Sequence, residues 1–558
     1  MDLQQCTWKS PIVMLLPSSK EREEAKEALK QHPPEVASNV RLRTGNPARM
    51  TNLVRVRAGA ARTIVYLDPD EEEDQEQLTV QKAAAAMALM AVRISQGARM
   101  AQTFVLQIAS SISRSNSSLL QQATHAYHSD RTWMVGVSKL EDVLGAMVGV
   151  CTLQPSLTGV FSDLLTVNPG TSALVYCVKS LEMEGLTHRE VRRRYHNSGI
   201  VCGYLHKNAM QRTSGLDDIS SSDSMEALMS ANDNLILNPP DNYVLKDGDT
   251  LLTIAKTASL ASSTDGTPAT LSSLFPATWE PLSRTPPNNR NDAWLKAPGI
   301  CEKIVLIACD RLLDTLLDTM AELSPPNGTI DVCVITTSEE TRDRMEELAD
   351  IYRLRDVRLT AILGSPTDDI VLMSAGVADC ESILVGNLDN STGAVKDDND
   401  ALLVAVLLLV KDIREQCESI VQPLRVVGLV GYRDTQLLAD IITASSSAPI
   451  TANLLNLDFL MAGWIAQVAA QPEVTLFFRE LLASCEGSEL YVRDAWPDYF
   501  ARDGATASFE EVQETARRRG ETAIGLIRGA TQEVEMPAVR TDLVQRDDSV
   551  VVLAADYS

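Results

Sequence analysis

Residues 302–337 read EKIVLIACDRLLDTLLDTMAELSPPNGTIDVCVITT, and this stretch decides the fold. EKIVLIACD (Glu302–Asp310) and TIDVCVITT (Thr329–Thr337) are short apolar runs, typical of buried strands. RLLDTLLDTMAEL (Arg311–Leu323) lies between them and has apolar residues at helical spacing. A strand, a helix and a second strand in this order predict parallel strands joined by a helical crossover.

The same alternation continues downstream. EETRDRMEELADIYRL predicts a charged amphipathic helix, and VRLTAILG, ESILVGNL and PLRVVGLVG predict buried strands near residues 357, 381 and 423. The helix before the last strand contains the apolar run Ala401–Val410. We interpret it as a buried core helix, since a bilayer core of roughly 30 Å needs about 20 apolar residues. Unbroken apolar strands alternating with helices predict a doubly wound parallel sheet, a Rossmann-like subdomain.

A different pattern follows this sheet. QPEVTLFFRELL predicts a helix, and ELYVRD, TAIGLIRG and SVVVLAA predict short strands separated by turns. The end of the chain is therefore expected to form a small α+β subdomain.

The chain carries this unit twice. LQPSLTGVFSDLL (Leu153–Leu165) matches AQPEVTLFFRELL (Ala470–Leu482), and Gln154 aligns with Gln471 at an offset of 471 − 154 = 317. RTGNPARMTNLVRVRAGAARTIVYL (Arg43–Leu67) matches LGSPTDDIVLMSAGVADCESILVGNL (Leu363–Leu388), and Leu235–Ala255 matches Glu533–Ala554. Three blocks in the same order indicate two copies of a unit of about 250 residues.

The first copy begins late, because its opening strand PIVMLLP (Pro11–Pro17) aligns with the second strand of the other copy. Its sheet should therefore lack the central first strand and expose an unpaired edge. In the first unit we predict a Rossmann-like subdomain without its first strand and helix at 1–132, and a linking helix with an α+β subdomain at 133–256. A Pro/Ser/Thr/Asn-rich linker follows at 257–299. In the second unit we predict a Rossmann-like subdomain at 300–448, and a linking segment with an α+β subdomain at 449–558.

Composition excludes several classes of protein. Lys plus Arg is 50 and Asp plus Glu is 75 in 558 residues, so the net charge is 50 − 75 = −25. A field of this sign repels nucleic acids and anionic lipids. The ten cysteines stand singly without zinc-ligand spacing, which indicates buried thiols in a reducing compartment. Neither a signal peptide nor a membrane-spanning segment is visible in the sequence.

Tandem Rossmann-like and α+β subdomains in an acidic chain resemble RCK domains, the regulators of K⁺ conductance. Three segments resemble the CASTOR/POLLUX family of ion channels in particular. They are RTGNPARMTNLVRVRAGAARTIVYL, ILNPPDNYVLKDGDTLLTIA (Ile236–Ala255) and the block Phe477–Ile527. The NPPDNYVLKDGD stretch is the most specific of these, and the resemblance runs in the same order along nearly the whole chain.

This resemblance implies a cation channel of nuclear envelope or plastid membranes. The family's RCK units form a homotetrameric gating ring that calcium regulates, and its pore helices precede the first unit. No such helices occur in these 558 residues. We therefore expect this chain to be soluble by itself, to form the regulatory ring region, and to conduct ions only with a pore.

Two acidic segments are candidate calcium sites, since calcium takes six to eight oxygen ligands. DPDEEEDQE directly follows the predicted strand TIVYL and offers Asp68, Asp70, Glu71 and Glu72. DNSTGAVKDDND stands at the matching place in the second copy and offers Asp397, Asp398 and Asp400. Ligands of α/β sheets bind at the carboxyl ends of strands, where both segments lie. The alternative is that both are solvated loops.

Other signatures are weaker or missing. The turn after the first strand of the second copy reads ACDRLL instead of the GxGxxG of dinucleotide-binding folds. The sequence also lacks GxSxG, HExxH and P-loop motifs, so we expect no enzymatic activity and no nucleotide cofactor. A soluble enzyme or NAD-linked sensor on the same fold, and a pore-less scaffold, remain as alternatives.

Three smaller features complete the set of candidates. Asp368 and Asp369 follow GSP and are interpreted as an ordinary helix N-terminus. His125 and His128 are interpreted as a surface pair rather than metal ligands. The triplet RRR occurs at 192–194 and again at 517–519, each in a predicted helix of an α+β subdomain. Its repetition predicts a shared interface or intramolecular salt bridges.

Overall fold

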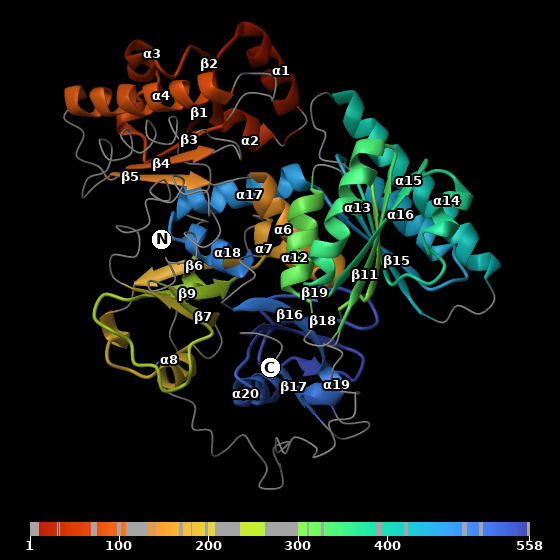
Figure 1. Cartoon of the computed structure of the whole chain (residues 1–558). Helices are drawn as coiled ribbons and strands as arrows, with labels where there is room; N and C mark the ends of the chain where they lie inside the picture. Colours follow the sequence, from red (N-terminus) through yellow and green to blue (C-terminus); the bar gives the residue numbers. More distant parts are fainter. Residues whose placement is uncertain are drawn as a thin grey trace.

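The computed structural model describes most of the chain, whose course Figure 1 follows from red to blue. The described residues are 11–30, 32, 34–67, 75–96, 102–107, 132–137, 140–166, 171–179, 181–195, 199–206, 235–262, 300–309, 312–324, 328–386, 393–417, 422–432, 434–482, 488–500 and 506–554. No helix within these ranges combines the length and apolar character that crossing a bilayer requires.

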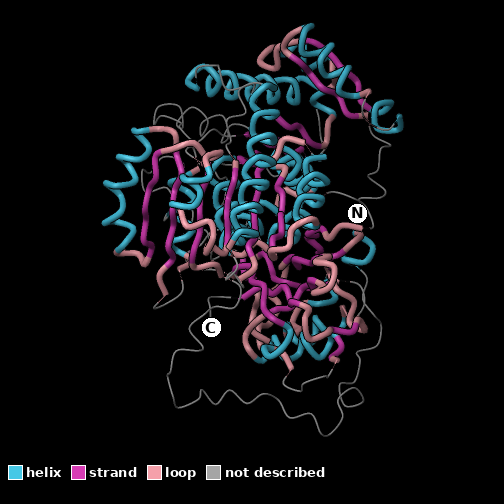
Figure 2. Tube along the Cα trace, turned by 90° about the vertical axis from the view of Figure 1, so that its right-hand side faces the viewer, coloured by secondary structure: helices cyan, strands magenta, loops and turns pink. Residues whose placement is uncertain are grey.

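The second unit begins with a six-stranded sheet whose strands are all parallel. Its strands are β10 (Lys303–Ile307), β11 (Ile330–Thr336), β12 (Val357–Leu363), β13 (Ser382–Val385), β14 (Leu424–Leu429) and β15 (Ile450–Leu455). They lie in the order β12-β11-β10-β13-β14-β15, the doubly wound order 3-2-1-4-5-6. The predicted Rossmann-like sheet is confirmed, and Figure 2 shows its strands side by side with helices packed along them.

Helices connect these strands and cover both faces of the sheet. They are α12 (Leu313–Glu322), α13 (Glu339–Arg353), α14 (Asp369–Ser374), α15 (Gly393–Gln416) and α16 (Asp434–Ala444). In Figure 1, α12 and α13 lie on one side of the sheet and α14, α15 and α16 on the other. Asp368 caps α14 by accepting a hydrogen bond from the Ile370 backbone N–H, as expected for a helix N-terminus. In α15, Leu403, Val406 and Val410 are buried, whereas Leu408 is 45% exposed, so the helix expected to be buried in the core is buried on one face only.

The first unit has two small parallel sheets where the second unit has one. Strands β1 (Ile12–Leu16) and β2 (Val40–Thr44) form one sheet, and β3 (Thr63–Tyr66), β4 (Gln102–Gln107) and β5 (Thr132–Val137) form the other. In the described part of the chain no strand joins β1 to β3, the place that β10 takes in the second unit. The accompanying helices are α1 (Ser19–Leu29), α2 (Pro34–Asn39), α3 (Met50–Arg55), the short 3-10 helix η1 (Ala58–Ala60) and α4 (Gln75–Gln96).

Each unit ends in an antiparallel sheet of four strands with one strand order. In the first unit the order β6-β9-β7-β8 joins β6 (Leu174–Lys179), β9 (Thr250–Ala255), β7 (Ile200–Leu205) and β8 (Leu235–Leu237). In the second unit the order β16-β21-β18-β19 joins β16 (Glu489–Asp494), β21 (Ser549–Ala554), β18 (Thr522–Ile527) and β19 (Val534–Glu535). A two-stranded ribbon of β17 (Ala507–Ser508) and β20 (Leu543–Val544) adds to the second. The α+β subdomains are therefore structural repeats, as predicted.

Short helices accompany both sheets, and the two principal ones start in the same way. They are η2 (Leu181–Met183), α8 (His188–Arg194) and α11 (Ala258–Ser262) in the first unit, and α19 (Ala495–Asp498) and α20 (Phe509–Arg518) in the second. Thr187 with Glu190 and Ser508 with Glu511 form capping boxes at α8 and α20. Helix α11 packs on β6 and β9, although its residues belong to the predicted linker. Residues 263–299 and 207–234 lie outside the described residues.

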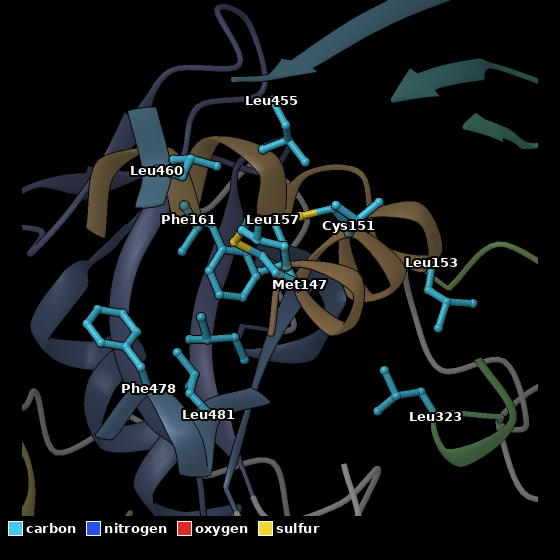
Figure 3. Close-up of a cluster of buried hydrophobic side chains, with 14 of the residues drawn as sticks. Met147, Cys151, Leu153, Leu157, Phe161, Leu323, Leu455, Leu460, Phe478 and Leu481 are labelled. Carbon is cyan, nitrogen blue, oxygen red and sulfur yellow. The ribbon is translucent and has the colours of Figure 1, made fainter. Parts of the chain in front are cut away.

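Two pairs of linking helices connect the subdomains, and each pair packs on the other unit. The pairs are α6 (Leu140–Leu153) with α7 (Leu157–Leu165), and α17 (Leu457–Ala470) with α18 (Val474–Leu482). Helix α6 of the first unit packs on α12 of the second, and α17 of the second unit packs on β3 and β4 of the first. Figure 3 shows Phe161 of α7 and Phe478 of α18 in the resulting core.

Hydrogen bonds also join each pair of linking helices to the opposite unit. The Gln154 side-chain oxygen of the first unit accepts a hydrogen bond of 3.1 Å from the Val492 backbone N–H in β16. Its counterpart Gln471 accepts one of 2.7 Å from the Cys177 backbone N–H in β6. The two glutamines that revealed the repeat therefore each satisfy a backbone donor in the opposite unit.

The close approach of α17 to α7 depends on glycine. A Cβ atom on Gly463 would lie 1.6 Å from the carbonyl oxygen of Leu165. Beside it, the Gln467 side-chain N–H donates a 2.6 Å hydrogen bond to the carbonyl oxygen of Leu164. These carbonyls lie at the end of α7, where a helix leaves backbone acceptors without intrahelical partners.

Replacing Gly463 should destabilise the chain. In an exposed helix Gly→Ala stabilises by about 1 kcal/mol. Because the added methyl group must push α17 away from α7, we expect Gly463→Ala to lower the unfolding free energy by roughly 1–3 kcal/mol. Urea unfolding measures this, with Ala462→Ser on the exposed side of α17 as the near-neutral control. Increased stability in Gly463→Ala would contradict the packing described here.

Candidate functional site between the two α+β subdomains

The predicted calcium ligands fall in three groups. Asp68, Asp70, Glu71 and Glu72 lie outside the described residues, as do His125 and His128. Asp397 and Asp398 lie on the backbone of α15, and their side chains are not among those described. Asp400 is buried and accepts hydrogen bonds from the backbone N–H groups of Gly431 (2.8 Å) and Tyr432 (3.2 Å) and from the Thr435 hydroxyl.

Asp400 thus fixes the loop between β14 and α16. Within the described ranges, no three Asp, Glu, His or Cys side chains converge as metal ligands. Calcium binding at the acidic segments stays a prediction.

A polar cluster joins the two α+β subdomains around Asp241, which belongs to the NPPDNY stretch. Arg517 of α20 donates to Asp241 Oδ1 from Nη2 at 2.8 Å and from Nε at 3.1 Å. Arg192 of α8 donates to the same oxygen at 3.1 Å. One carboxylate therefore binds an arginine from each RRR triplet, which confirms the predicted salt bridges.

Asn238 adds a second set of contacts between the subdomains. Its side-chain oxygen accepts hydrogen bonds from Arg517 Nη1 at 3.2 Å and from the Thr522 hydroxyl at 2.7 Å. Its side-chain N–H donates to the Gly520 carbonyl oxygen. The backbone of Asn238 has φ 46°, a left-handed conformation that asparagine tolerates better than most residues. The residue type thus suits both the turn and the contact.

Electrostatics of the cluster follow from burial and from the crowding of guanidinium groups. Burial alone would raise the pKa of Asp241, but the hydrogen bonds and charge of Arg517, with the charge of Arg192, hold it below its usual value. Burial and the nearby Arg517 charge lower the pKa of Arg192 to about 10. Burial and both arginines lower the pKa of His188 to about 2. The His188 ring is therefore neutral, and it shares a 2.6 Å hydrogen bond with the Tyr204 hydroxyl.

A cavity of about 110 Å³ lies beside this cluster. Residues of both α+β subdomains line it, namely Arg192, Tyr195, Gly199, Ile200, Val201, Lys256 and Leu260 from the first, and Gln513, Pro537, Ala538, Val539 and Arg540 from the second. Arg540 reaches across the junction, since its Nη2 donates to the Arg192 carbonyl oxygen at 3.2 Å. Its Nη1 donates to Glu510 of its own subdomain at 3.1 Å. A molecule in this cavity would contact both units at once.

Asp163 of α7 is a carboxyl group with an unusual environment. Burial raises its pKa to about 6, although a hydrogen bond from the Ala173 backbone N–H and the charge of Lys256 lower it in part. Its charge therefore changes within the range that cells experience.

Sequence reasoning singled out some of these groups and missed others. The RRR triplets and the NPPDNY stretch are visible as patterns, but no pattern shows that Asp241 lies between the triplets. Lys256, Arg540 and the cavity have no local signal, because their lining joins segments hundreds of residues apart.

Removal of Arg517 should weaken the junction. Its side chain is 5% exposed, against 45% for its neighbour Arg518. Arg517→Ala leaves Asp241 and Asn238 without their shared donor, so we expect a loss of roughly 3 kcal/mol and faster hydrogen exchange in β8. Arg518→Ala should change stability by no more than about 0.5 kcal/mol. Equal effects of the two substitutions would exclude this role for Arg517.

Asp163 should make stability depend on pH. The folded pKa lies above the ordinary value of 3.8, so the native state holds more protons than the unfolded state between these values. The contribution of Asp163 therefore rises as the pH falls from about 7 towards 4. Urea unfolding at pH 7.5, 6.5 and 5.5 should show that Asp163→Asn has lost this rise while the wild type keeps it. Parallel pH profiles would disprove the assignment.

The sequence is similar to those of known ion channels. No profile of a known protein family matches the chain. The chain is 24% identical to the probable ion channel POLLUX of Arabidopsis thaliana over 550 residues, covering 93% of this chain and 58% of that protein. It is 23% identical to the ion channel CASTOR of Lotus japonicus over 523 residues, covering 90% of this chain and 54% of that protein. The chain thus spans little more than half the length of these relatives.

A solved structure shares the fold. The human SLO3 gating ring superposes with a TM-score of 0.57 at 13% sequence identity, covering 98% of this chain and 95% of that one. The similarity therefore extends over both tandem units. The chain is therefore similar to CASTOR/POLLUX ion channels along most of its length, and its two tandem units share the fold of a solved RCK gating ring.

Proposed function

We propose that this chain is the regulatory gating-ring region of a CASTOR/POLLUX-like cation channel. Ligand binding to the ring would change its shape and so act on a pore. The pore helices would come from a part of the full-length protein outside this chain. The relatives are named ion channels, which supports a regulatory role over an enzymatic one.

The observation that carries the proposal is an apolar face on the outer helices of the second unit. Six large side chains of α14, α15 and α16 are between 45% and 66% exposed: Ile370, Met373, Leu408, Leu437, Leu438 and Ile441. Exposed apolar surface of this extent on a folded unit marks an interaction site. We name these six residues the α14–α16 face.

The first unit carries a similar face on the matching helices. Met50 and Val54 of α3, and Met87 and Ile94 of α4, are between 40% and 71% exposed. Val54 matches Met373 at the repeat offset of 373 − 54 = 319. Two related faces on one chain let each copy contact two neighbours, the arrangement from which rings are built.

The occupant of these faces is therefore a second copy of the chain. Four chains would place eight units in a homotetrameric ring, with calcium as the regulator that the resemblance implies. A full-length channel would hold this ring at a nuclear envelope or plastid membrane. The acidic segments around Asp70 and Asp398 are the calcium sites that we propose.

Charged residues on the α14–α16 face should prevent assembly. We expect the wild type to have a native mass near four times 60.8 kDa by light scattering, and Leu438→Glu with Ile441→Glu to be smaller. Leu354→Glu is the matched control, because Leu354 is 88% exposed at the end of α13, on the opposite face of the sheet. The same measurement with calcium and with a chelator tests the effector. A wild-type monomer in both solutions would argue against the ring.

A further inference from the structure

The lining of the cavity between the α+β subdomains carries an excess of positive charge. Arg192, Lys256 and Arg540 contribute three cations, and none of the described lining residues is acidic. The carboxylates that pair with the two arginines, Asp241 and Glu510, do not line the cavity. In a chain of net charge −25, a wall of this sign is distinctive.

Lys256 is the least compensated of the three cations. No ion pair or hydrogen bond joins its ammonium group to any residue that the structure describes, and its charge acts at a distance on half-buried Asp163. Lys256 follows β9 directly, so the antiparallel sheet fixes where its side chain starts. An ammonium group held in this way is a point charge suited to a phosphate oxygen.

Most of the remaining lining is apolar. Tyr195 and Pro537 form part of its lining, and Leu260 and Val539 are 39% and 53% exposed. Leu260 belongs to the first unit and Val539 to the second, so a ring or aliphatic group of a ligand packed against these two side chains would contact both units. Cationic and apolar parts together match an organic anion.

We propose that this cavity binds a small phosphate ester. Its phosphate lies among Lys256, Arg192 and Arg540, and its body lies against Leu260 and Val539. A volume of about 110 Å³ holds a phosphate group and the part of the ligand next to it. Binding is by charge-assisted hydrogen bonds and apolar contact, without any covalent step.

The site would link ligand binding to the arrangement of the two units. Phosphate oxygens between Lys256 of the first unit and Arg540 of the second favour the closed junction around Asp241. This consequence for gating depends on the proposed function, whereas the binding itself does not.

Isothermal titration of the full chain tests the proposal with adenosine monophosphate, inorganic phosphate and adenosine as probes. We expect adenosine monophosphate to bind more tightly than phosphate, and adenosine to give no signal. Lys256→Gln should weaken the binding of adenosine monophosphate by about tenfold, and Lys256→Arg should restore most of it. Lys179→Gln, an exposed lysine of the same subdomain outside the cavity, is the matched control.

Several results would overturn the assignment. One is no binding of adenosine monophosphate, and another is unchanged affinity in Lys256→Gln. Equal affinities for phosphate and adenosine monophosphate would refute a contact with the ligand body. The titration is repeated on the Leu438→Glu, Ile441→Glu variant. Binding that persists there separates this site from ring assembly, so either proposal can fail alone.

Discussion

The exchange of linking helices between the two units is the constraint on which the rest of this structure depends. Helix α6 completes the core of the second unit, and α17 covers the sheet of the first. The close approach at Gly463 and the reciprocal hydrogen bonds of Gln154 and Gln471 fix the pairs in position. Because each unit buries apolar helices of the other, neither forms a complete core alone.

This exchange also places the polar junction. With the linking helices fixed, the turn after β8 of the first unit and α20 of the second come close enough for Arg517 to reach Asn238 and Asp241. The apolar core sets the distance between the subdomains, and the arginine cluster sets their orientation, since guanidinium–carboxylate geometry is directional. The cavity follows as the space that two rigid sheets leave beside that cluster.

Apolar periodicity in the sequence correctly predicted individual strands and helices. The apolar run at Lys303–Ile307 becomes a central strand, and the one at Ala401–Val410 becomes a helix with one buried face, because periodicity acts within a few residues. The repeat predicted an α+β subdomain at the end of each unit, and the two sheets share one strand order. The exchange of helices escaped prediction, since Phe161 and Phe478 look like core residues whichever unit they cover. Acidic runs were the least informative pattern for finding a binding site. Asp400 is buried and accepts backbone hydrogen bonds, but the sequence around it looks the same as that of an exposed acidic loop.

Repetition of sequence does not imply repetition of role, and the arginine triplets show why. Both triplets lie at helices that begin with a capping box, but Arg192 is 192 − 187 = 5 residues after Thr187 and Arg517 is 517 − 508 = 9 residues after Ser508. Asp241 of the first unit nevertheless binds both arginines. One carboxylate between two arginines breaks the symmetry of the junction and leaves positive charge beside the cavity. The asymmetry therefore separates a structural contact, at Arg517, from the surface at Lys256 and Arg540 that we propose to bind a phosphate ester.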